Sequence, residues 1–322
     1  MQIENKHSAN ISTASFLAFA LLNTLVVFLG IADYVFFDHQ LSDIAARYIN
    51  PDLYFVFIGF PHIIASFFTM FHQNYFTSYK TVFLKKIIPV LLVACTLIFI
   101  NFNLYKLLFI FLLSIHVAGQ ATGISRYFGI ENGKSFLIWK SINCTLLLFS
   151  FLIMYNKEFL LLLPISFSSL KLLIMFIFLM TNFAVIPVVM RTTTVKGKLY
   201  LLLIQFQLAG ICYFSVVESL LYWGIMITFF HDVIAFIFYV NHERNAESAG
   251  NLNFLIGNKF LPIGIVVILI SIVVAAGLAH FLTLFSIPFV MFLFQIAHYL
   301  LEGDIWLSGS LHRKYITMKH YV

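Results

Sequence analysis

ISTASFLAFALLNTLVVFLGIADYVFF, residues 11–37, is a continuous apolar run in which Asp33 is the single charged side chain. A helix that crosses a hydrocarbon core about 30 Å thick needs about 20 apolar residues, and this run exceeds that length. It is also longer than the apolar core of a secretory signal peptide, and it has no A-x-A-like end. We therefore expect residues 11–37 to remain in the protein as a transmembrane helix.

The rest of the chain has the same apolar character. Of its 322 residues, 61% are hydrophobic and 10% are charged, and a soluble domain needs more charge than this to cover its surface. Apolar runs between polar residues predict an all-α, polytopic bundle of about ten transmembrane helices, nine to eleven being compatible with the sequence. The predicted spans lie near residues 12–37, 52–72, 83–101, 105–125, 136–155, 169–190, 199–219, 222–241, 260–280 and 281–301. They fill residues 1–322 as one integral membrane domain.

Basic residues indicate how these helices are oriented. With ten spans and a cytoplasmic N-terminus, fourteen Lys and Arg residues fall in cytoplasmic segments, and three fall outside, Arg47, Lys106 and Lys157. This bias follows the positive-inside rule and predicts that both termini are cytoplasmic, in a membrane such as the bacterial inner (plasma) membrane. The basic residues are scattered and form no stripe, so we expect no nucleic-acid partner.

Histidines are concentrated on the even-numbered spans. A titratable side chain inside a membrane is costly, so each one is a candidate functional residue. The set comprises His62 and His72 on the second span, His116 on the fourth, His231 and His242 on the eighth and His298 on the tenth, with His312 just beyond. Most of them lie in the cytoplasmic half of the predicted spans. So many buried polar groups need one another or a ligand, which predicts a metal or proton-handling site.

Helical spacing selects the candidate ligands within this set. His298 and Glu302 are four residues apart, the spacing at which two side chains of one helix can hold one ion. His231 and His242 are eleven residues apart and return to nearly the same helix face. We expect His62, His116, His231 and His298 as core metal ligands, His72 and His242 as further or outer ligands, and Glu302 and Asp232 as carboxylate partners.

The types of ligand also narrow the choice of metal. Imidazoles with a few carboxylates suit iron or zinc, whereas the three cysteines form no CxxC pair and an all-oxygen magnesium site would not need histidine. Iron with dioxygen suits a site inside a membrane, where an apolar substrate is accessible. Hydrolysis at a zinc ion is the alternative.

Two kinds of backbone residue accompany the histidines. Gly119 and Gly123 on the fourth span are expected to allow close helix contact. Pro61, just before His62, is expected to bend its helix and open space beside the site.

Two segments resemble a known family. The stretch Gly59-Phe60-Pro61-His62, and His231-Asp232 with the aromatic run to His242-Glu243-Arg244, are similar to motifs of the Brp/Blh family of bacterial membrane β-carotene dioxygenases. That family consists of polytopic iron proteins whose histidines bind the metal, so the resemblance implies a membrane iron dioxygenase. The chain departs from the family pattern after His62, where Ile63 and Ile64 follow in place of glycine and a nearby aspartate.

Three functional hypotheses follow from these observations. The first is a membrane-embedded, non-haem iron oxidoreductase or oxygenase that acts on a membrane lipid or isoprenoid. The second is a proton-coupled transporter in which the same histidines form a relay, since imidazole titrates near neutrality. The third is a lipid-modifying transferase or a non-catalytic assembly factor. The sequence leaves open whether the chain is an enzyme.

Overall fold

The computed structural model describes residues 11–48, 55–72, 75–130, 133–155, 160, 166–248, 263–284, 289–307, 310–316 and 318–319. Within these ranges the chain is helical, apart from two short strands, β1 (Ile11–Ser12) and β2 (Met318–Lys319). The two strands pair in parallel, with Ile11 opposite Met318. The predicted all-α class is therefore confirmed.

The chain divides into two compact units. The first unit comprises Met1–Ser12, Pro51–Ile100 and Asp232–Lys319, and the second comprises Thr13–Asn50, Asn101–His231 and His320–Val322. One boundary between them falls inside a helix, between His231 and Asp232. The expectation of one integral membrane domain stays a prediction.

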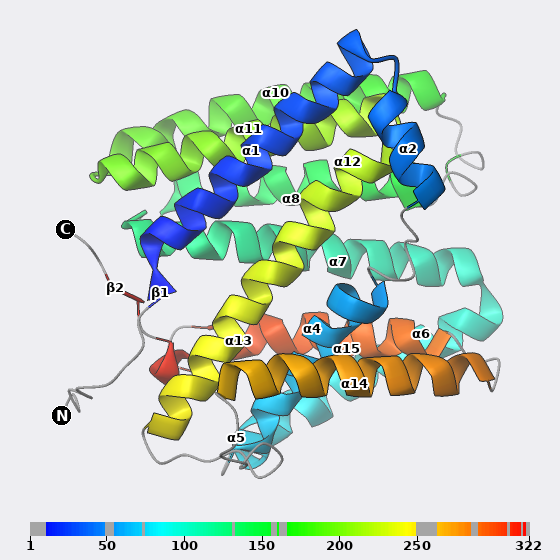
Figure 1. Ribbon diagram of the computed structural model, residues 1–322, viewed down its shortest axis with the longest axis vertical. Helices are drawn as coiled ribbons and strands as arrows, with labels where there is room; N and C mark the ends of the chain where they lie inside the picture. Colours follow the sequence, from blue (N-terminus) through cyan, green and yellow to red (C-terminus); the bar gives the residue numbers. More distant parts are fainter. Residues whose placement is uncertain are drawn as a thin grey trace. The chain divides into compact units, whose positions relative to one another are not determined.

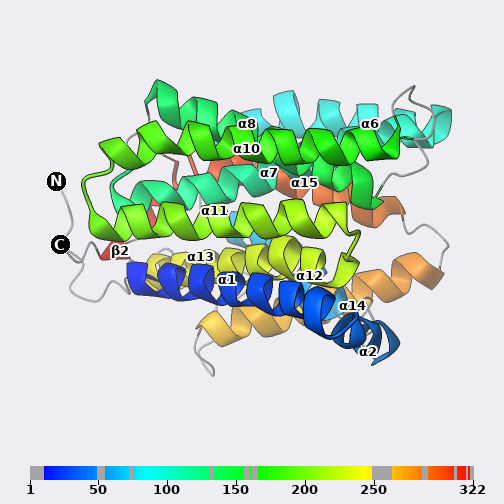
Figure 2. The same cartoon turned by 90° about the horizontal axis from the view of Figure 1, so that it is seen from above.

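The second unit is a layered arrangement of long helices. Its elements are α1 (Thr13–Phe36), α2 (Gln40–Tyr48), α7 (Phe102–Ser125), η4 (Arg126–Phe128), α8 (Lys134–Tyr155), α10 (Phe167–Arg191), α11 (Val195–Val216), α12 (Leu220–Gly224) and η5 (Ile225–Phe229). Helix α8 packs against α7 and α10, and α11 packs against α10 and α1 (Figure 2). Side-chain caps begin several of these helices, for example Thr194, which accepts a hydrogen bond from the backbone N–H of Gly197.

The helices of the first unit pack around a short central helix. Its elements are η1 (Phe55–Gly59), α4 (Phe60–Phe68), η2 (Thr69–Phe71), α5 (Tyr75–Val82), η3 (Phe83–Ile87), α6 (Ile88–Ile100), α13 (Phe230–Ser248, whose first two residues belong to the second unit), α14 (Ile263–Leu284), α15 (Phe289–Ile305) and η6 (His312–Tyr315). Helix α4 lies against α14 and α15 (Figure 1). Nearly all of its side chains are buried, so the polar residues that it carries are held inside the unit.

Within the described ranges, eight helical stretches are long and apolar enough to cross a membrane. They cover eight of the predicted spans, and the other two predicted spans correspond to the shorter segment around α4 and to α15. The protein is thus a multi-pass integral membrane protein. The predicted break between the seventh and eighth spans is present, and there Glu218 adopts a left-handed backbone conformation with φ of 61°.

Several boundaries differ from the sequence-based expectation. Lys80, expected in the connection before the third span, lies within the continuous helical stretch Tyr75–Ile100. Helix α13 continues to Ser248, so the loop predicted to start at Glu243 begins later. His280, expected near a break, lies inside α14.

The role predicted for the two glycines needs correction, and the bend expected at Pro61 stays a prediction. Pro61 lies in the first turn of α4, which directly follows the π-helical segment η1, inside a helical stretch that runs from Phe57 to Phe71. A Cβ atom added to Gly119 or Gly123 would meet no other atom within 4 Å among the described residues. Close packing occurs instead at Gly30 and Gly210, where an added Cβ would meet neighbouring side chains at 2.3 Å and 2.6 Å.

Candidate metal site

His62 and His298 face each other inside the first unit. His62 lies on α4 and His298 on α15, and both rings are buried. Their Nε2 atoms are 3.2 Å apart. Two nitrogen ligands about 2.0–2.1 Å from one ion lie about 2.9 Å apart at a right angle and about 3.3 Å apart at the tetrahedral angle. The observed separation therefore suits two ligands of a single ion.

The opposite ring nitrogen of each histidine faces an acceptor. Nδ1 of His298 is 2.9 Å from Oγ of Ser66, whose own proton is donated to the carbonyl oxygen of Ile63 at 2.6 Å. A carbonyl oxygen can only accept, so Ser66 accepts from the His298 ring. Nδ1 of His62 lies 3.2 Å from a carboxylate oxygen of Asp232, on α13. Nδ1 of His298 thus carries its ring hydrogen, and the Nε2 lone pair of His298 faces Nε2 of His62.

Glu302 brings a carboxylate to the same place. It follows His298 by one turn of α15, is buried, and places Oε1 4.0 Å from Nε2 of His298. Neighbouring ligand atoms of one ion lie about 2.9–3.3 Å apart, so at 4.0 Å Glu302 lies near the two histidines without completing their ligand set. Asp304, in the next turn, instead forms an ion pair with Lys86 at 2.5 Å.

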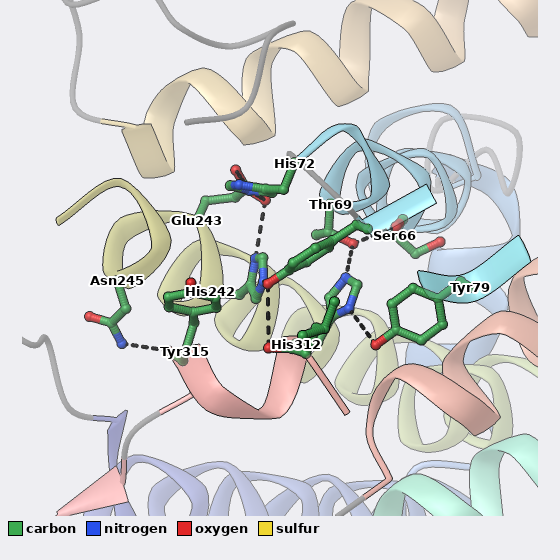
Figure 3. Close-up of polar contacts among 11 residues, drawn as sticks. Ser66, Thr69, His72, Tyr79, His242, Glu243, Asn245, His312 and Tyr315 are labelled. Atoms are coloured by element: carbon green, nitrogen blue, oxygen red, sulfur yellow. Dashed lines mark hydrogen bonds and ion pairs between the residues drawn. The ribbon is translucent and has the colours of Figure 1, made fainter. Parts of the chain in front are cut away.

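A second group of ligand-type side chains in this unit consists of His72, His242 and Glu243, here called the Glu243 cluster (Figure 3). Nε2 of His72 is 2.9 Å from both carboxylate oxygens of Glu243. Nδ1 of His242 is 3.2 Å from Oε1 of the same carboxylate. All three side chains are at most 2% exposed.

His312 covers this cluster from the C-terminal segment. Its Nδ1 atom is 3.0 Å from the hydroxyl of Tyr79, and its Nε2 atom is 2.7 Å from Oγ1 of Thr69 (Figure 3). The ring stacks on that of His242 at a centroid distance of 4.7 Å. Burial lowers the pKa of the His312 imidazole well below its usual range, and the nearby rings of His242 and His72 lower it further.

The second unit contains another pair of facing imidazoles. Nε2 of His116, on α7, lies 2.9 Å from Nε2 of His231, and both rings are buried. Gln120, one turn after His116, donates to the backbone carbonyl of His231 at 3.4 Å. This pair also has the spacing of two ligands of one ion.

The eight predicted site residues are thus all buried in polar clusters. In the first unit the structure brings together His62, His298, Asp232 and Glu302, and separately His72 and His242; in the second unit it brings together His116 and His231. Sequence reasoning missed Glu243 and Ser66. Glu243 directly follows a candidate histidine, which is a usable signal, whereas a single serine in an apolar helix gives none.

Comparisons with known proteins add no assignment. No protein-family model, curated protein or solved structure matches the chain.

Proposed function

We propose that the protein is a membrane-embedded, non-haem iron oxygenase that acts on an apolar lipid or isoprenoid, with His62 and His298 as metal ligands. The observation that carries this proposal is the 3.2 Å separation of the Nε2 atoms of two buried histidines. A single cation between two nitrogens at this separation could be bound by both. Burial of both rings keeps bulk water away from these atoms.

The outer contacts of the two histidines support a metal as that cation. Imidazole ligands of metals typically donate their other N–H to a carboxylate, a carbonyl or a hydroxyl, which fixes the tautomer and the orientation of the ring. Asp232 provides such a contact for His62, and Ser66 provides one for His298. Both contacts come from buried side chains of the same unit.

The donor set favours iron among the available metals. Imidazole nitrogens beside buried carboxylates suit non-haem iron, which can leave positions open for dioxygen and substrate. Zinc accepts the same donors and is the alternative. Iron bound there would supply the activation of dioxygen. The residues of the chain would hold the two ligands in place and exclude water, and Ser66 would keep Nε2 of His298 unprotonated.

The surroundings support an apolar substrate. The site lies in a multi-pass membrane protein whose interior is lined mainly by aliphatic and aromatic side chains. Lipids and isoprenoids reach such a site from the bilayer. If both oxygen atoms of dioxygen enter the substrate, the reaction balances without a separate reductant.

The proposed topology has ten spans with both termini in the cytoplasm of a bacterial cell. The eight long apolar helices supply most of these spans, and the segment around α4 together with α15 supplies the others. The clustering of Lys and Arg in alternate connections supports this orientation.

Elemental analysis of the purified protein tests the proposal. We expect the double variant His62→Ala/His298→Ala to lose one equivalent of iron, whereas His280→Ala, which changes an exposed histidine of α14, keeps it. Incubation of the iron-loaded protein with dioxygen and mixed membrane lipids and isoprenoids should give an oxygenated product only where that iron is present. A folded double variant with unchanged metal content and activity would overturn the proposal.

A proton relay is the second candidate, because a proton could also be shared between Nε2 of His62 and Nε2 of His298. This function predicts a folded protein without bound metal. It also predicts pH-dependent substrate uptake in proteoliposomes that is lost in the double variant.

A further inference from the structure

The Glu243 cluster lies apart from His62 and His298. On α13, Glu243 follows Asp232 by eleven residues, which corresponds to about 16 Å along the helix axis. His72 is likewise ten residues after His62. An ion held by His62 and His298 therefore cannot also be held by the Glu243 cluster.

The Glu243 cluster places three ligand-type groups in a dry interior. Glu243 is 1% exposed, and both His72 and His242 lie within hydrogen-bonding distance of its carboxylate. A divalent cation would interact favourably with a buried carboxylate and two imidazoles at this place.

The hydrogen bonds of Tyr75 define which nitrogen of His242 is available. The Tyr75 hydroxyl donates to the backbone carbonyl of Leu311 at 3.3 Å and lies 3.1 Å from Nε2 of His242. When the single hydroxyl proton is donated to Leu311, Nε2–H of His242 can donate to the phenol oxygen. Nδ1 of His242, 3.2 Å from Oε1 of Glu243, is then available as a metal ligand.

We infer that His72, His242 and Glu243 bind a second divalent transition-metal ion, of the zinc or ferrous iron class. Their ligand atoms lie within 4.8 Å of one another, and Glu243 has both oxygens 2.9 Å from His72, which leaves room for either mode of carboxylate binding. Two histidines and one glutamate are a donor set used by both metals. The inference does not depend on the proposed oxygenase activity.

The surroundings assign this second ion a structural role. His312 stacks on His242 and is held by Tyr79 and Thr69, so the cluster is closed by the C-terminal segment (Figure 3). Structural metal sites are closed in this way, whereas catalytic sites keep a position open. The ion would link α13 to the segment after α4, and residues 310–316 would pack over it.

Metal stoichiometry in matched variants tests the second site. Glu243→Gln keeps the shape of the side chain and its ability to accept hydrogen bonds but removes the charge. Glu247→Gln makes the same change one turn later on α13, at an exposed position, and is the control. We expect about two metal equivalents in the wild type and in Glu247→Gln, and about one in Glu243→Gln. Chelation should lower the thermal unfolding temperature of the first two proteins more than that of Glu243→Gln.

Size-exclusion chromatography identifies variants that fail to fold. If Glu243→Gln aggregates, Glu243→Asp replaces it, and the shorter carboxylate should weaken zinc binding by more than about tenfold, the smallest loss typical of changes around a metal site. A folded Glu243→Gln protein with the metal content and chelator response of Glu247→Gln would overturn the inference. If Glu243→Gln loses one metal equivalent but His62→Ala/His298→Ala loses none, the proposed function alone is overturned. A wild-type protein that binds no metal would overturn both the proposed function and the second site.

Discussion

Nε2 of His62 and Nε2 of His298 lie 3.2 Å apart, although 236 positions separate the two residues in the sequence. Nδ1 of His298 lies 2.9 Å from Oγ of Ser66, and Nδ1 of His62 lies 3.2 Å from a carboxylate oxygen of Asp232. In the proposed metal site, the affinity for metal would depend on these two outer contacts.

Ser66→Ala should weaken metal binding without unfolding the protein. The change removes the acceptor for Nδ1 of His298, so the ring loses its fixed tautomer and orientation. Removal of an outer contact of this kind typically lowers metal affinity by about 10–100-fold. Competition with a fluorescent chelator measures the effect, with Ser141→Ala, an exposed serine of α8, as control. Equal affinities of the two variants would show that the Ser66 contact does not orient a ligand.

Asp232→Asn should have a related but smaller effect. The amide oxygen still accepts from Nδ1 of His62, while the negative charge that makes the imidazole a stronger donor is lost. We expect an affinity loss of about tenfold, and a larger loss in Asp232→Ala. We expect metal affinity to decrease in the order wild type, Asp232→Asn, Asp232→Ala. A lower affinity in Asp232→Asn than in Asp232→Ala would contradict this prediction.

The long membrane helices were predictable from the sequence, because the length of an apolar run alone decides whether it spans a bilayer. The pairing of the histidines was not, since it depends on which helices pack together. Periodicity placed His62 and His298 on helices, but only the packing of α4 against α15 brings them together.

The helical region around Glu243 shows why boundaries were harder to predict. Hydropathy assigned the polar residues after His242 to a loop, yet α13 continues because tertiary contacts bury some of them. Asn245 donates to the backbone carbonyl of Tyr315 at 2.7 Å, in a segment 70 residues away. Local sequence contains no information about that partner, so the continuation of α13 past Glu243, one of three buried acids among the described residues of the first unit, was not predicted.

Glycine substitutions should distinguish tight from open helix surfaces. A Cβ on Gly30 would meet a ring carbon of Phe214 at 2.3 Å and one of Tyr222 at 2.8 Å. Gly30→Ala should therefore lower the free energy of unfolding by about 1–3 kcal/mol, the usual cost of overpacking. A Cβ on Gly119 would meet no atom of the described residues within 4 Å. Gly119→Ala should therefore leave stability unchanged or slightly raised. Thermal unfolding in detergent measures both, and equal shifts would contradict the packing described.

Asp33, in the run that first indicated a membrane helix, anchors the unexpected helix α2. Its carboxylate accepts hydrogen bonds from the backbone N–H groups of Leu41 and Ser42 at 2.8 Å and 3.0 Å, and from the Ser42 hydroxyl at 2.8 Å. The hydroxyl of Tyr222 donates to it at 3.0 Å. The carboxylate thus satisfies N–H groups in the first turn of α2 that have no partner within that helix.

Asp33→Asn should destabilise the protein by about 1.5–3 kcal/mol, because an amide cannot accept all four hydrogen bonds and carries no charge to strengthen them. Tyr222→Phe removes one of these bonds and should cost about 1 kcal/mol. Since both changes affect the same contact, the double variant should lose less stability than the sum of the single variants. Asp43→Asn, at an exposed position of α2, is the control. Unfolding in detergent measures these losses of stability. If the loss in the double variant equals the sum of the losses in the two single variants, the hydrogen bond from Tyr222 to Asp33 contributes nothing to folding.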